Sequence, residues 1–303
     1  MKVVSLLPAA TEIVCALGLR DRLVGRSHAC DFPEDVASLP ALTQPRVDSL
    51  LPSAELDAQV RRIVRQRLPI YMLDEARLAA LAPDVVVTQE ACEVCAVSYD
   101  QVMGSLKRTA PKAAVVSLRP SRLSDVLDDV RRLAEACGVS GRGEREAVDL
   151  ERRLAALAAR TGAAGSTAGA APPLVAVVEW LAPPMLAGHW VPDTIAAASA
   201  SAVGPGPGEP SRYTSWGEIR ALRPDAVVVA PCGFDLPRTL REAEPLSDTL
   251  RGLAPRVLVM DGNAYLNRPG PRLVEAAEAI AAWLLGERVD AARALAWETT
   301  VPS

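Results

Sequence analysis

The 303 residues are half hydrophobic and carry a formal net charge of -4 at pH 7, a balance that excludes an intrinsically disordered chain. The sequence has no long run of Lys or Arg, so it lacks the basic patch that binds a nucleic acid or an anionic membrane. No apolar stretch reaches the roughly 18 residues that a membrane-spanning helix needs. At about 150 residues per domain, the length predicts two domains or one large one.

The beginning of the chain is typical of folded structure. Residues 2–6 form a short apolar run that predicts a buried strand, and residues 9–17 follow as a helix that Gly18 closes. This assignment leaves no residues for the basic region, apolar core and cleavage site of a signal peptide. Six cysteines are too few for a disulfide scaffold in a chain of this size. We therefore expect a cytoplasmic, reducing location, and an extracytoplasmic one only if the start is misassigned.

Runs rich in β-branched residues predict strands that are buried on both faces, as in a parallel sheet. In the first half of the chain the strands are expected at 2–6, 22–26, 69–73, 84–88 and 113–118, and in the second half at 174–178, 225–230 and 256–260. Helical patterns lie between these runs, so the sheets should be mostly parallel, with right-handed crossovers.

A short internal repeat supports two similar lobes. The segment Leu81-Ala82-Pro83-Asp84 recurs as Leu222-Arg223-Pro224-Asp225, and a β-branched run follows each copy. Each copy also follows a helical stretch, so the Pro-Asp turn joins a helix to a buried strand. Two such units predict two α/β lobes in one chain.

An amphipathic helix is expected between the lobes, at residues 121–137. Pro120 precedes it, Gly138 ends it, and apolar residues recur along it at three- and four-residue spacings. The expected fold is α/β, with two Rossmann-like lobes at 1–119 and 140–290, joined by one long rigid helix at 120–139 and followed by a tail at 291–303. Residues 144–159 predict a second helix, and the Gly- and Pro-rich segments 161–173 and 202–210 predict flexible loops.

Several short motifs, taken together, resemble one family. They are residues 5–12 (SLLPAATE), 24–33 (VGRSHACDFP), 183–190 (PPMLAGHW) and 267–272 (NRPGPR), together with the repeated Leu-x-Pro-Asp unit. Over roughly residues 2 to 286 the chain is similar to the iron-siderophore and cobalamin substrate-binding proteins of ABC importers, particularly the cobalamin-binding type. The resemblance implies two α/β lobes joined by a long helix and non-enzymatic ligand binding in the cleft between them.

The resemblance also implies which residues bind the ligand. The family's cleft segment after the second strand falls on His28, Ala29 and Cys30, and its segment in the second lobe falls on Ala264, Tyr265, Leu266, Asn267 and Arg268. Trp180 and Trp190 lie in a loop expected to face the cleft. Trp216 and Tyr213 lie near one of the tryptophans that flank the corrin in a relative, while Gln89 replaces another.

An ABC permease is the partner that the resemblance implies. Family members usually carry a docking carboxylate seven residues before the proline of each Leu-x-Pro-Asp unit. Those positions are Ala76 and Gly217 here, and Glu75 and Glu218 lie next to them. One residue along a helix turns a side chain by about 100°, so docking at the usual positions is not expected.

Two cysteine motifs follow predicted strands at their carboxyl ends, where open α/β sheets bind ligands. His28 with Cys30, and Cys92 with Cys95, supply four ligands, enough for a tetrahedral zinc ion. We predict that the four side chains converge in one site. The thiols are also compatible with a redox pair, with a contact to the metal of a chelate, or with plain apolar loop residues. Cys232 is the counterpart in the second lobe.

Aromatic residues in the second lobe point to a flat ligand. His189 and Trp190 follow Gly188 in a proline-flanked loop, an arrangement that suits an apolar ligand with a polar or metal centre, although a tryptophan folded over the lobe surface is equally consistent. Trp216 stands at a predicted helix start, where a ligand contact is slightly favoured. Trp283 and Trp297 are not expected to contact ligand.

The sequence contains no nucleophile elbow, no P-loop and no His-Glu-x-x-His motif, so we expect a protein that is not an enzyme and needs no cofactor. The leading hypothesis is a binding protein for cobalamin, another corrinoid or a related metal chelate. The alternative is an intracellular metal-binding protein or metallochaperone that uses the histidine and cysteine cluster. A cysteine-dependent redox enzyme is the third class considered.

Overall fold

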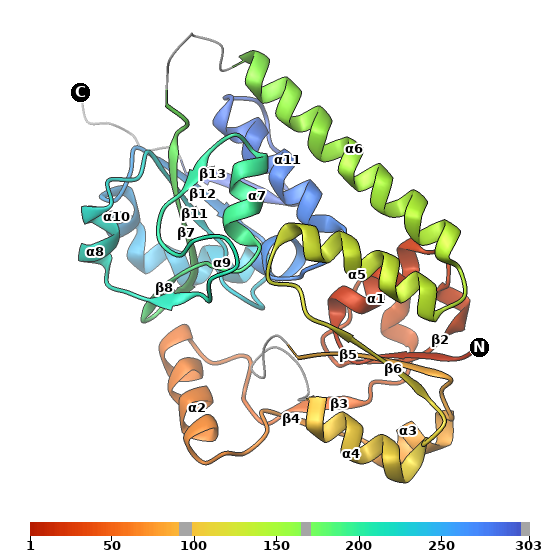
Figure 1. Ribbon diagram of the computed structural model, residues 1–303. Coiled ribbons are helices and arrows are strands. Elements are labelled where there is room, and N and C mark those ends of the chain that lie inside the picture. Colours follow the sequence, from red (N-terminus) through yellow and green to blue (C-terminus); the bar gives the residue numbers. More distant parts are fainter. Residues whose placement is uncertain (91–98, 165–170, 298–303) are drawn as a thin grey trace. The chain divides into compact units, whose positions relative to one another are not determined.

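The computed structural model describes residues 1–90, 99–164 and 171–297 (Figure 1). Contacts divide the chain into two compact units. Unit 1 consists of Met1–Leu51, Glu55–Pro120 and Ser124–Asp149, and unit 2 of Pro52–Ala54, Ser121–Leu123 and Leu150–Ser303. No helix in the described ranges has the length and apolar character that crossing a membrane requires.

Unit 1 is built on a four-stranded parallel sheet with the strand order β2-β1-β5-β6. The strands are β1 (Val3–Ser5), β2 (Leu23–Arg26), β5 (Val85–Gln89) and β6 (Ala114–Leu118). All four were predicted from their apolar runs. The helices of this region are α1 (Pro8–Ala16), α2 (Ser53–Arg65), α3 (Glu75–Leu81), α4 (Tyr99–Thr109) and α5 (Leu123–Ala136), with 3-10 turns at Arg20–Arg22 and Glu34–Ser38.

The strand expected at 69–73 does not join this sheet, so the prediction was wrong in placing it there. It is the shorter β4 (Tyr71–Leu73), which pairs antiparallel with β3 (Thr43–Pro45) in a separate two-stranded sheet. Its residues alternate between partly buried and exposed, whereas all five residues of β5 are buried. A three-residue apolar run does not distinguish these two environments.

Unit 2 is built on a seven-stranded mixed sheet with the order β10-β8-β7-β11-β12-β13, and β9 pairs with β7. The predicted strands form its parallel centre: β7 (Leu174–Leu181), β11 (Ala226–Val229) and β12 (Arg256–Met260). Strands that were not predicted complete it: β8 (Pro184–Leu186), β9 (Ser201–Ala202), β10 (Arg212–Tyr213) and β13 (Ala294–Trp297). β13 pairs antiparallel with β12, so part of the segment expected as a tail is an edge strand.

Alternate residues of the central strands of unit 2 contribute to two separate core clusters, one on each face of the sheet. Val177, Val228 and Leu258 face α6 (Ser140–Ala164), α7 (Val191–Ala197) and α11 (Arg272–Leu284). Val178 and Val229 face α8 (Trp216–Ala221), α9 (Leu236–Ala243) and α10 (Ser247–Arg251). The 3-10 turn Glu244–Leu246 joins α9 to α10. Unit 2 is therefore a three-layer α/β structure of the expected class.

The aspartate of each Leu-x-Pro-Asp segment accepts the same kind of backbone hydrogen bond in both units, here called the Asp joint. Asp84 accepts a hydrogen bond from the backbone N–H of Lys2 at 2.6 Å, and Asp225 accepts one from Leu174 at 2.7 Å. The residue before each proline adopts a left-handed conformation, with φ of 45° at Ala82 and 50° at Arg223. Each copy thus fixes the amino end of its lobe's first strand beside the strand that follows the repeat.

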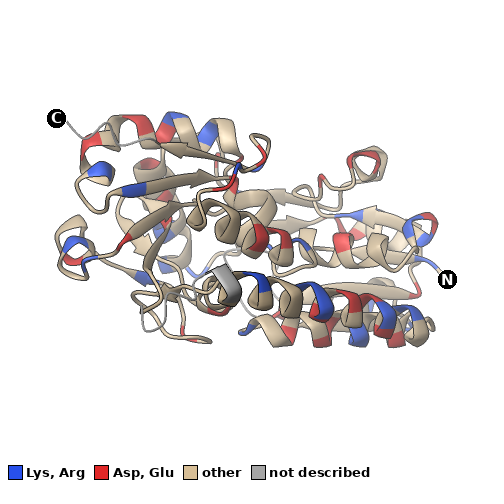
Figure 2. Ribbon diagram, turned by 90° about the horizontal axis from the view of Figure 1, so that it is seen from above, with Lys and Arg blue, Asp and Glu red and all other residues tan. Residues whose placement is uncertain are grey.

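The amphipathic helix expected at residues 121–137 is present as α5. Val126, Val130 and Leu133 of α5 are buried, and α5 from Ser124 onward belongs to unit 1. Contact boundaries fall both between Leu123 and Ser124, at the start of α5, and between Asp149 and Leu150, within α6, a helix of 25 residues that is about 38 Å long. The apolar stripe that predicted this helix is its buried packing face, and its role as a rigid interlobe link stays a prediction. Figure 2 shows basic and acidic residues interspersed along the described helices, in keeping with the low net charge.

Candidate functional site

The carboxyl end of β2 in unit 1 places His28 beside the small β3-β4 sheet. The backbone N–H of His28 donates to the Thr43 hydroxyl at 2.9 Å, and the ring Nδ1 lies 2.7 Å from the same oxygen. The His28 and Tyr71 rings lie 5.3 Å apart between centroids. The two-stranded sheet that the sequence did not predict therefore holds this histidine in position.

The environment of His28 keeps its imidazole neutral. Burial, and then the nearby charge of Arg26, lower the pKa of His28 below its usual 6.5. With Nδ1 engaged by Thr43, the remaining ring nitrogen is Nε2, and no hydrogen bond to it occurs among the described residues. Metal binding at Nε2 requires the neutral tautomer in which Nδ1–H donates to the Thr43 oxygen.

Cys30 lies deeper than its partner in the predicted motif. Its side chain is buried, and the Thr11 hydroxyl on α1 lies 3.0 Å from its sulfur. Ala29 is partly buried in the turn between them. Cys92 and Cys95 lie outside the described residues, so the predicted convergence of the four side chains stays a prediction. Within the described ranges, no group of three or more His, Cys, Asp or Glu residues could hold a metal ion.

In unit 2, hydrogen bonds connect the carboxyl ends of three neighbouring strands into one edge. The N–H of Cys232, after β11, donates to Glu179 of β7 at 2.9 Å. The Asn267 side chain, after β12, donates to the Ala230 carbonyl at 2.9 Å. The predicted residues Cys232 and Asn267 therefore belong to the same edge, and Asn267 and Cys232 are both partly buried there.

His189 and Trp190 join this edge from the loop before α7. The Trp190 indole N–H donates to the Leu266 carbonyl at 2.8 Å, and the His189 and Trp190 rings lie 5.6 Å apart. Burial lowers the pKa of His189, whose backbone is left-handed with a φ of 52°. Its N–H donates to Glu209 and its carbonyl accepts from Gly208. The segment 202–210, expected to be a flexible loop, thus fixes this histidine.

The loop after β12 contains the π-helix Gly262–Leu266, labelled η4, and places its predicted residues differently. Tyr265 and Ala264 are partly buried, whereas Leu266 and Arg268 are buried. The Tyr265 ring lies under two guanidinium groups, with Arg272 at 5.4 Å and Arg293 at 5.7 Å. Burial is the main cause that raises the pKa of Tyr265. Leu266 is buried and its carbonyl already accepts from Trp190, so it serves to hold Trp190 in place.

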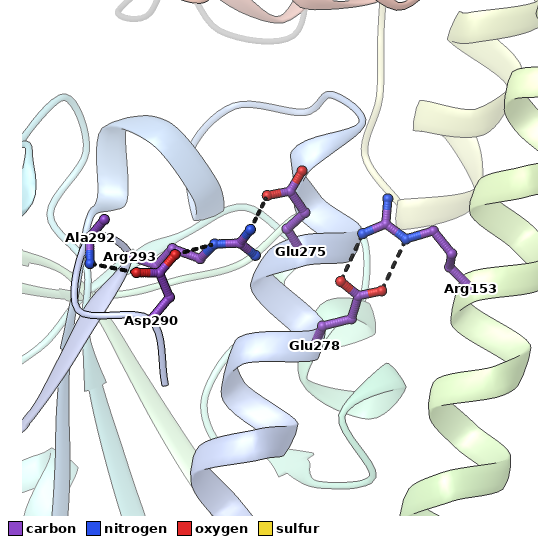
Figure 3. Close-up of polar contacts among 6 residues, drawn as sticks. All are labelled: Arg153, Glu275, Glu278, Asp290, Ala292 and Arg293. Carbon is purple, nitrogen blue, oxygen red and sulfur yellow. Dashed lines mark hydrogen bonds and ion pairs between the residues drawn. The ribbon is translucent and has the colours of Figure 1, made fainter. Parts of the chain in front are cut away.

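Figure 3 shows how Arg293 is held. It contacts Glu275 at 3.2 Å and Asp290 at 3.5 Å, and the N–H of Ala292 donates to the Asp290 carboxylate. These acidic partners neutralise one of the two guanidinium groups beside Tyr265. The cluster is therefore an internally paired support for the loop.

The other two tryptophans predicted to contact the ligand, Trp180 and Trp216, lie apart from one another. Trp216 begins α8 and packs on the opposite face of the sheet from Trp190. Trp180 stands at the end of β7, where its ring lies 5.2 Å from Phe234. The structure thus brings His189, Trp190 and Leu266 together and leaves Trp216 outside that group.

Sequence reasoning missed three residues that shape these edges. Thr43 and Tyr71 contact His28, and Phe234 contacts Trp180. Nothing in the sequence of β3 or β4 indicates that a threonine and a tyrosine there contact a histidine in a separate loop. Phe234 stands two residues after Cys232, so its place at a strand end was the one available signal.

The comparison with protein families decides the identity of this fold. The family described as periplasmic binding protein matches residues 3–244. The chain belongs to the periplasmic binding protein family. This family is one of binding proteins, which is the functional class expected from the sequence. The expectation of a cytoplasmic location was wrong, because the family is periplasmic.

Solved structures of periplasmic binding proteins have the same fold. A periplasmic heme-binding protein from Pseudomonas aeruginosa matches with a TM-score of 0.74 and 20% identity, covering 99% of each chain. A periplasmic vitamin B12-binding protein of Vibrio cholerae matches with a TM-score of 0.65 and 17% identity, covering 95% of this chain and 98% of that one. A comparison with curated proteins found no match.

Proposed function

We propose that this periplasmic binding protein binds a planar metal chelate, a corrinoid or a haem, for an ABC importer. The observation that carries the proposal is the environment of His28, a neutral imidazole fixed by Thr43 beside the ring of Tyr71. Imidazole nitrogen and phenol oxygen are both axial ligands that proteins supply to the iron of haem. The side chains of His28 and Tyr71 therefore suit a metal that still accepts an axial ligand.

A chelate fits His28 better than a free metal ion does. Structural zinc sites use four protein ligands, and catalytic ones use three. A macrocycle fills four positions around its metal, so that one protein donor is enough to complete the coordination. The buried sulfur of Cys30, in contact with Thr11, is less suited to that role than His28.

Unit 2, taken by itself, also has aromatic surface of the kind that a flat ligand needs. Trp190 and His189 lie with their rings 28° from parallel, and hydrogen bonds fix both residues. Small-molecule sites combine apolar and aromatic contacts with a few placed polar groups. The heme and vitamin B12 named for two similar structures are chelates of this shape and support the same ligand class.

Titration of the full chain with haemin, cobinamide and cobalamin tests the proposal. We expect saturable changes in the absorbance of at least one chelate and quenching of tryptophan fluorescence after inner-filter correction. His28→Ala should remove the ligand-field change and weaken binding about tenfold or more, while Trp283→Phe, on buried α11, should leave affinity unchanged. Absence of binding by all three chelates at tens of micromolar rejects the proposal.

We also propose a permease as the partner, with contacts that differ from those implied by the usual carboxylate positions. Glu75 pairs with Arg108 at 2.5 Å. Glu218 accepts hydrogen bonds from Thr214 and Ser215 and completes the cap of α8. Glu75 therefore already joins α3 to α4, and Glu218 already caps its own helix. Pull-down with the permease of a neighbouring gene should succeed for the wild-type chain and persist in the Glu75→Gln variant if docking uses other residues.

A metal-binding role for the cysteines is the second candidate, and it depends on Cys92 and Cys95. Metal analysis of the purified chain, with Cys92→Ser and Cys95→Ser as comparisons, separates it from chelate binding. One zinc ion per chain that is lost in both variants would favour the metal site.

A further inference from the structure

Arginines are concentrated at the carboxyl end of α2, which is drawn in orange in Figure 1. Residues 58–72 contain no acidic residue and have four arginines, which are Arg61, Arg62, Arg65 and Arg67. All four side chains are exposed, and they belong to unit 1. Arg46 is also exposed, and its backbone N–H donates to the Ile70 carbonyl at 2.7 Å, which places it near the turn that follows α2. The fold thus gathers basic side chains that form no long run in the sequence.

Most of these cations have no partner within the fold. Arg61 pairs with Asp57 at 2.6 Å. Among the residues that the structure describes, the other four make no side-chain hydrogen bond and no ion pair, and we call them the α2 arginine surface: Arg46, Arg62, Arg65 and Arg67. The carboxylate of Asp48, two residues after Arg46, instead accepts the backbone N–H of Leu50 at 3.0 Å. The guanidinium donors of the α2 arginine surface are therefore available to water or to a partner.

Stabilisation of the helix end explains only part of this pattern. Arg62 and Arg65 lie in the last turn of α2, where positive charge is favourable. Arg67 lies beyond that turn, at a position that glycine usually fills. Its N–H donates to the Val64 carbonyl at 2.9 Å, the next N–H donates back to Ile63 at 3.2 Å, and its φ is 55°. An arginine in this left-handed conformation costs folding free energy, and strain of this kind points to a function of the side chain outside the fold.

Exposed apolar side chains lie among the arginines. Val64 and Leu68, which alternate with them in the sequence, are 51% and 46% exposed. Leu50 is 87% exposed, and the backbone N–H of Asp48 donates to the Gln59 side chain at 2.8 Å, which holds this segment against α2. Surfaces by which proteins bind one another are enriched in arginine and often include exposed apolar patches. The α2 arginine surface has this composition.

The packing of α2 favours a protein over a lipid bilayer as the partner. An interfacial helix enters a membrane with its apolar face. That face of α2 is used within the fold, because Leu56 is 8% and Ile63 is 6% exposed. Guanidinium groups bind carboxylates through two parallel hydrogen bonds, which add specificity to the attraction between the charges. The α2 arginine surface therefore suits a protein surface that carries Asp and Glu residues.

We propose that the α2 arginine surface, together with Val64 and Leu68, is the surface by which this protein docks to acidic residues of its permease. The inference rests on the proposed permease partner and names the docking surface in unit 1. The sign of the charge is opposite to that of the carboxylate positions implied by the family resemblance, beside which Glu75 and Glu218 are already bonded. Opposite charges on two protein surfaces speed their association, and salt weakens this effect.

Binding kinetics of the full chain test the inference. The immobilised probe is the permease and ATPase complex of neighbouring genes, in nanodiscs of zwitterionic phosphatidylcholine. The double substitution Arg62→Glu, Arg65→Glu should weaken binding at least about tenfold in low salt, mainly through slower association, and less in high salt. The matched control Arg145→Glu, Arg288→Glu makes the same change in net charge at two exposed arginines outside the surface, and it should bind within about twofold of wild type.

Two further variants separate docking from folding. Arg62→Lys, Arg65→Lys keeps the charges at the helix end but loses the planar fork, so docking should weaken about threefold at an unchanged melting temperature. Arg67→Gly removes the left-handed arginine, so the melting temperature should stay the same or rise while docking weakens about threefold. Lower stability with unchanged docking in Arg67→Gly would reject its place in the surface. All variants should bind the preferred chelate like wild type.

The outcomes separate this inference from the proposed function. Binding to the complex that is unchanged in Arg62→Glu, Arg65→Glu overturns the docking surface and leaves the permease proposal standing. A wild-type chain that does not bind the complex overturns both. Binding to phosphatidylglycerol vesicles, or self-association in sedimentation, that depends on these arginines without a matching loss on the nanodisc complex identifies a lipid or a second copy as the partner and overturns the inference.

Discussion

The protonation state of His28 links its local contacts to ligand binding. Because burial and Arg26 lower its pKa, the imidazole is neutral at pH 7 and protonates below pH 6.5. A protonated ring cannot donate its electron pair to a metal. We therefore expect chelate affinity to be constant from pH 7 to 8 and to fall as the pH drops through the lowered pKa.

Absorbance titrations at pH 5.0, 6.0 and 7.5 measure this dependence. In His28→Gln the residual affinity should be about tenfold weaker at pH 7.5 and should lose the acidic drop. Identical pH profiles for the two proteins would contradict a ligating role for His28.

Asp129 provides a residue-scale prediction about stability. Its carboxyl group is 1% exposed and pairs with Arg132 at 2.7 Å. Burial is the main cause that raises its pKa from 3.8 to about 7. A raised pKa favours the protonated form in the folded state, so its stabilising effect is complete below pH 3.8 and is lost as the pH rises to about 7.

Thermal unfolding between pH 4.5 and 8 tests this sign. Asp129→Asn should gain stability relative to wild type as the pH increases through this window. Asp128→Asn changes an exposed neighbour on the same helix and should show no such trend. A gain for Asp129→Asn that is the same at every pH would show that the carboxyl group does not titrate there.

The left-handed residue of the second Leu-x-Pro-Asp segment predicts a stabilising substitution. Arg223 has a φ of 50°, a conformation that costs about 1 kcal/mol for residues with a Cβ atom and is open to glycine. Arg223→Gly should therefore increase the free energy of unfolding by about 0.5 kcal/mol, after the greater flexibility of glycine in the unfolded chain is subtracted.

Urea denaturation followed by circular dichroism measures this change. Leu222→Gly is the control, because Leu222 has a φ of -71° and caps α8 in a right-handed conformation. Destabilisation by both substitutions would show that the backbone at Arg223 is not strained.

At the scale of elements, α6 and α11 are joined by a two-point ion pair. Arg153 donates to both carboxylate oxygens of Glu278, at 3.0 and 2.7 Å (Figure 3). Paired geometry of this kind makes an arginine–carboxylate contact stronger than a single hydrogen bond. Both side chains are about one-third exposed, so water and salt weaken it.

A double-mutant cycle of Arg153→Ala and Glu278→Ala should give a coupling of about 0.5–1 kcal/mol in low salt and less in 1 M NaCl. The Arg160 and Glu287 pair, at 3.5 Å and about half exposed, provides the comparison and should give a coupling near zero. Equal coupling for both pairs would show that the two-point geometry adds nothing.

Element by element, the sequence predicted the structure where periodicity was strong. The buried runs of β5, β7, β11 and β12 have the composition of parallel strands and were placed correctly. Edge strands of two to four residues, such as β9 and β10, are too short to show a period. Residues 69–73 were placed in the wrong sheet, because an apolar triplet does not specify its pairing partner.

The candidate site was predictable only in outline. Position at the carboxyl ends of predicted strands singled out His28 and Cys232 as candidates, and Trp180 was a candidate because its loop was expected to face the cleft. Contacts between distant segments, such as His28 with Thr43 or Trp180 with Phe234, depend on tertiary packing and leave no local pattern. The cytoplasmic location was predicted wrongly from the start of the chain, because the periodicity and composition of a folded domain do not indicate the compartment in which the protein acts.

At the scale of the whole molecule, unit 2 is almost continuous in sequence. Apart from Pro52–Ala54 and Ser121–Leu123, it consists of Leu150 onward, and it contains both faces of its own core. A fragment of residues 150–303 should therefore fold alone and unfold cooperatively, with a melting temperature several degrees lower than in the full chain.

The decrease should come from lost anchors. Asp193 binds Arg122 at 2.6 and 2.8 Å, and Glu242 accepts from Ser53, so the fragment lacks both contacts. Circular dichroism and calorimetry of the fragment check this. A non-cooperative transition would mean that the short segments contribute more than these contacts indicate.

The two ends of the parallel strands in each sheet have different roles, one in stabilising the fold and the other in the proposed binding of the ligand. The Asp84 and Asp225 joints lie at the amino ends of the strands and tie backbone to side chain, whereas the candidate ligand residues lie at the carboxyl ends. We therefore expect substitutions at one end to leave the hydrogen bonds of the other end unchanged. Ligand preference in such a scaffold can diverge through loop changes alone, and a new specificity can be engineered at the carboxyl ends while the amino-end joints keep the fold intact.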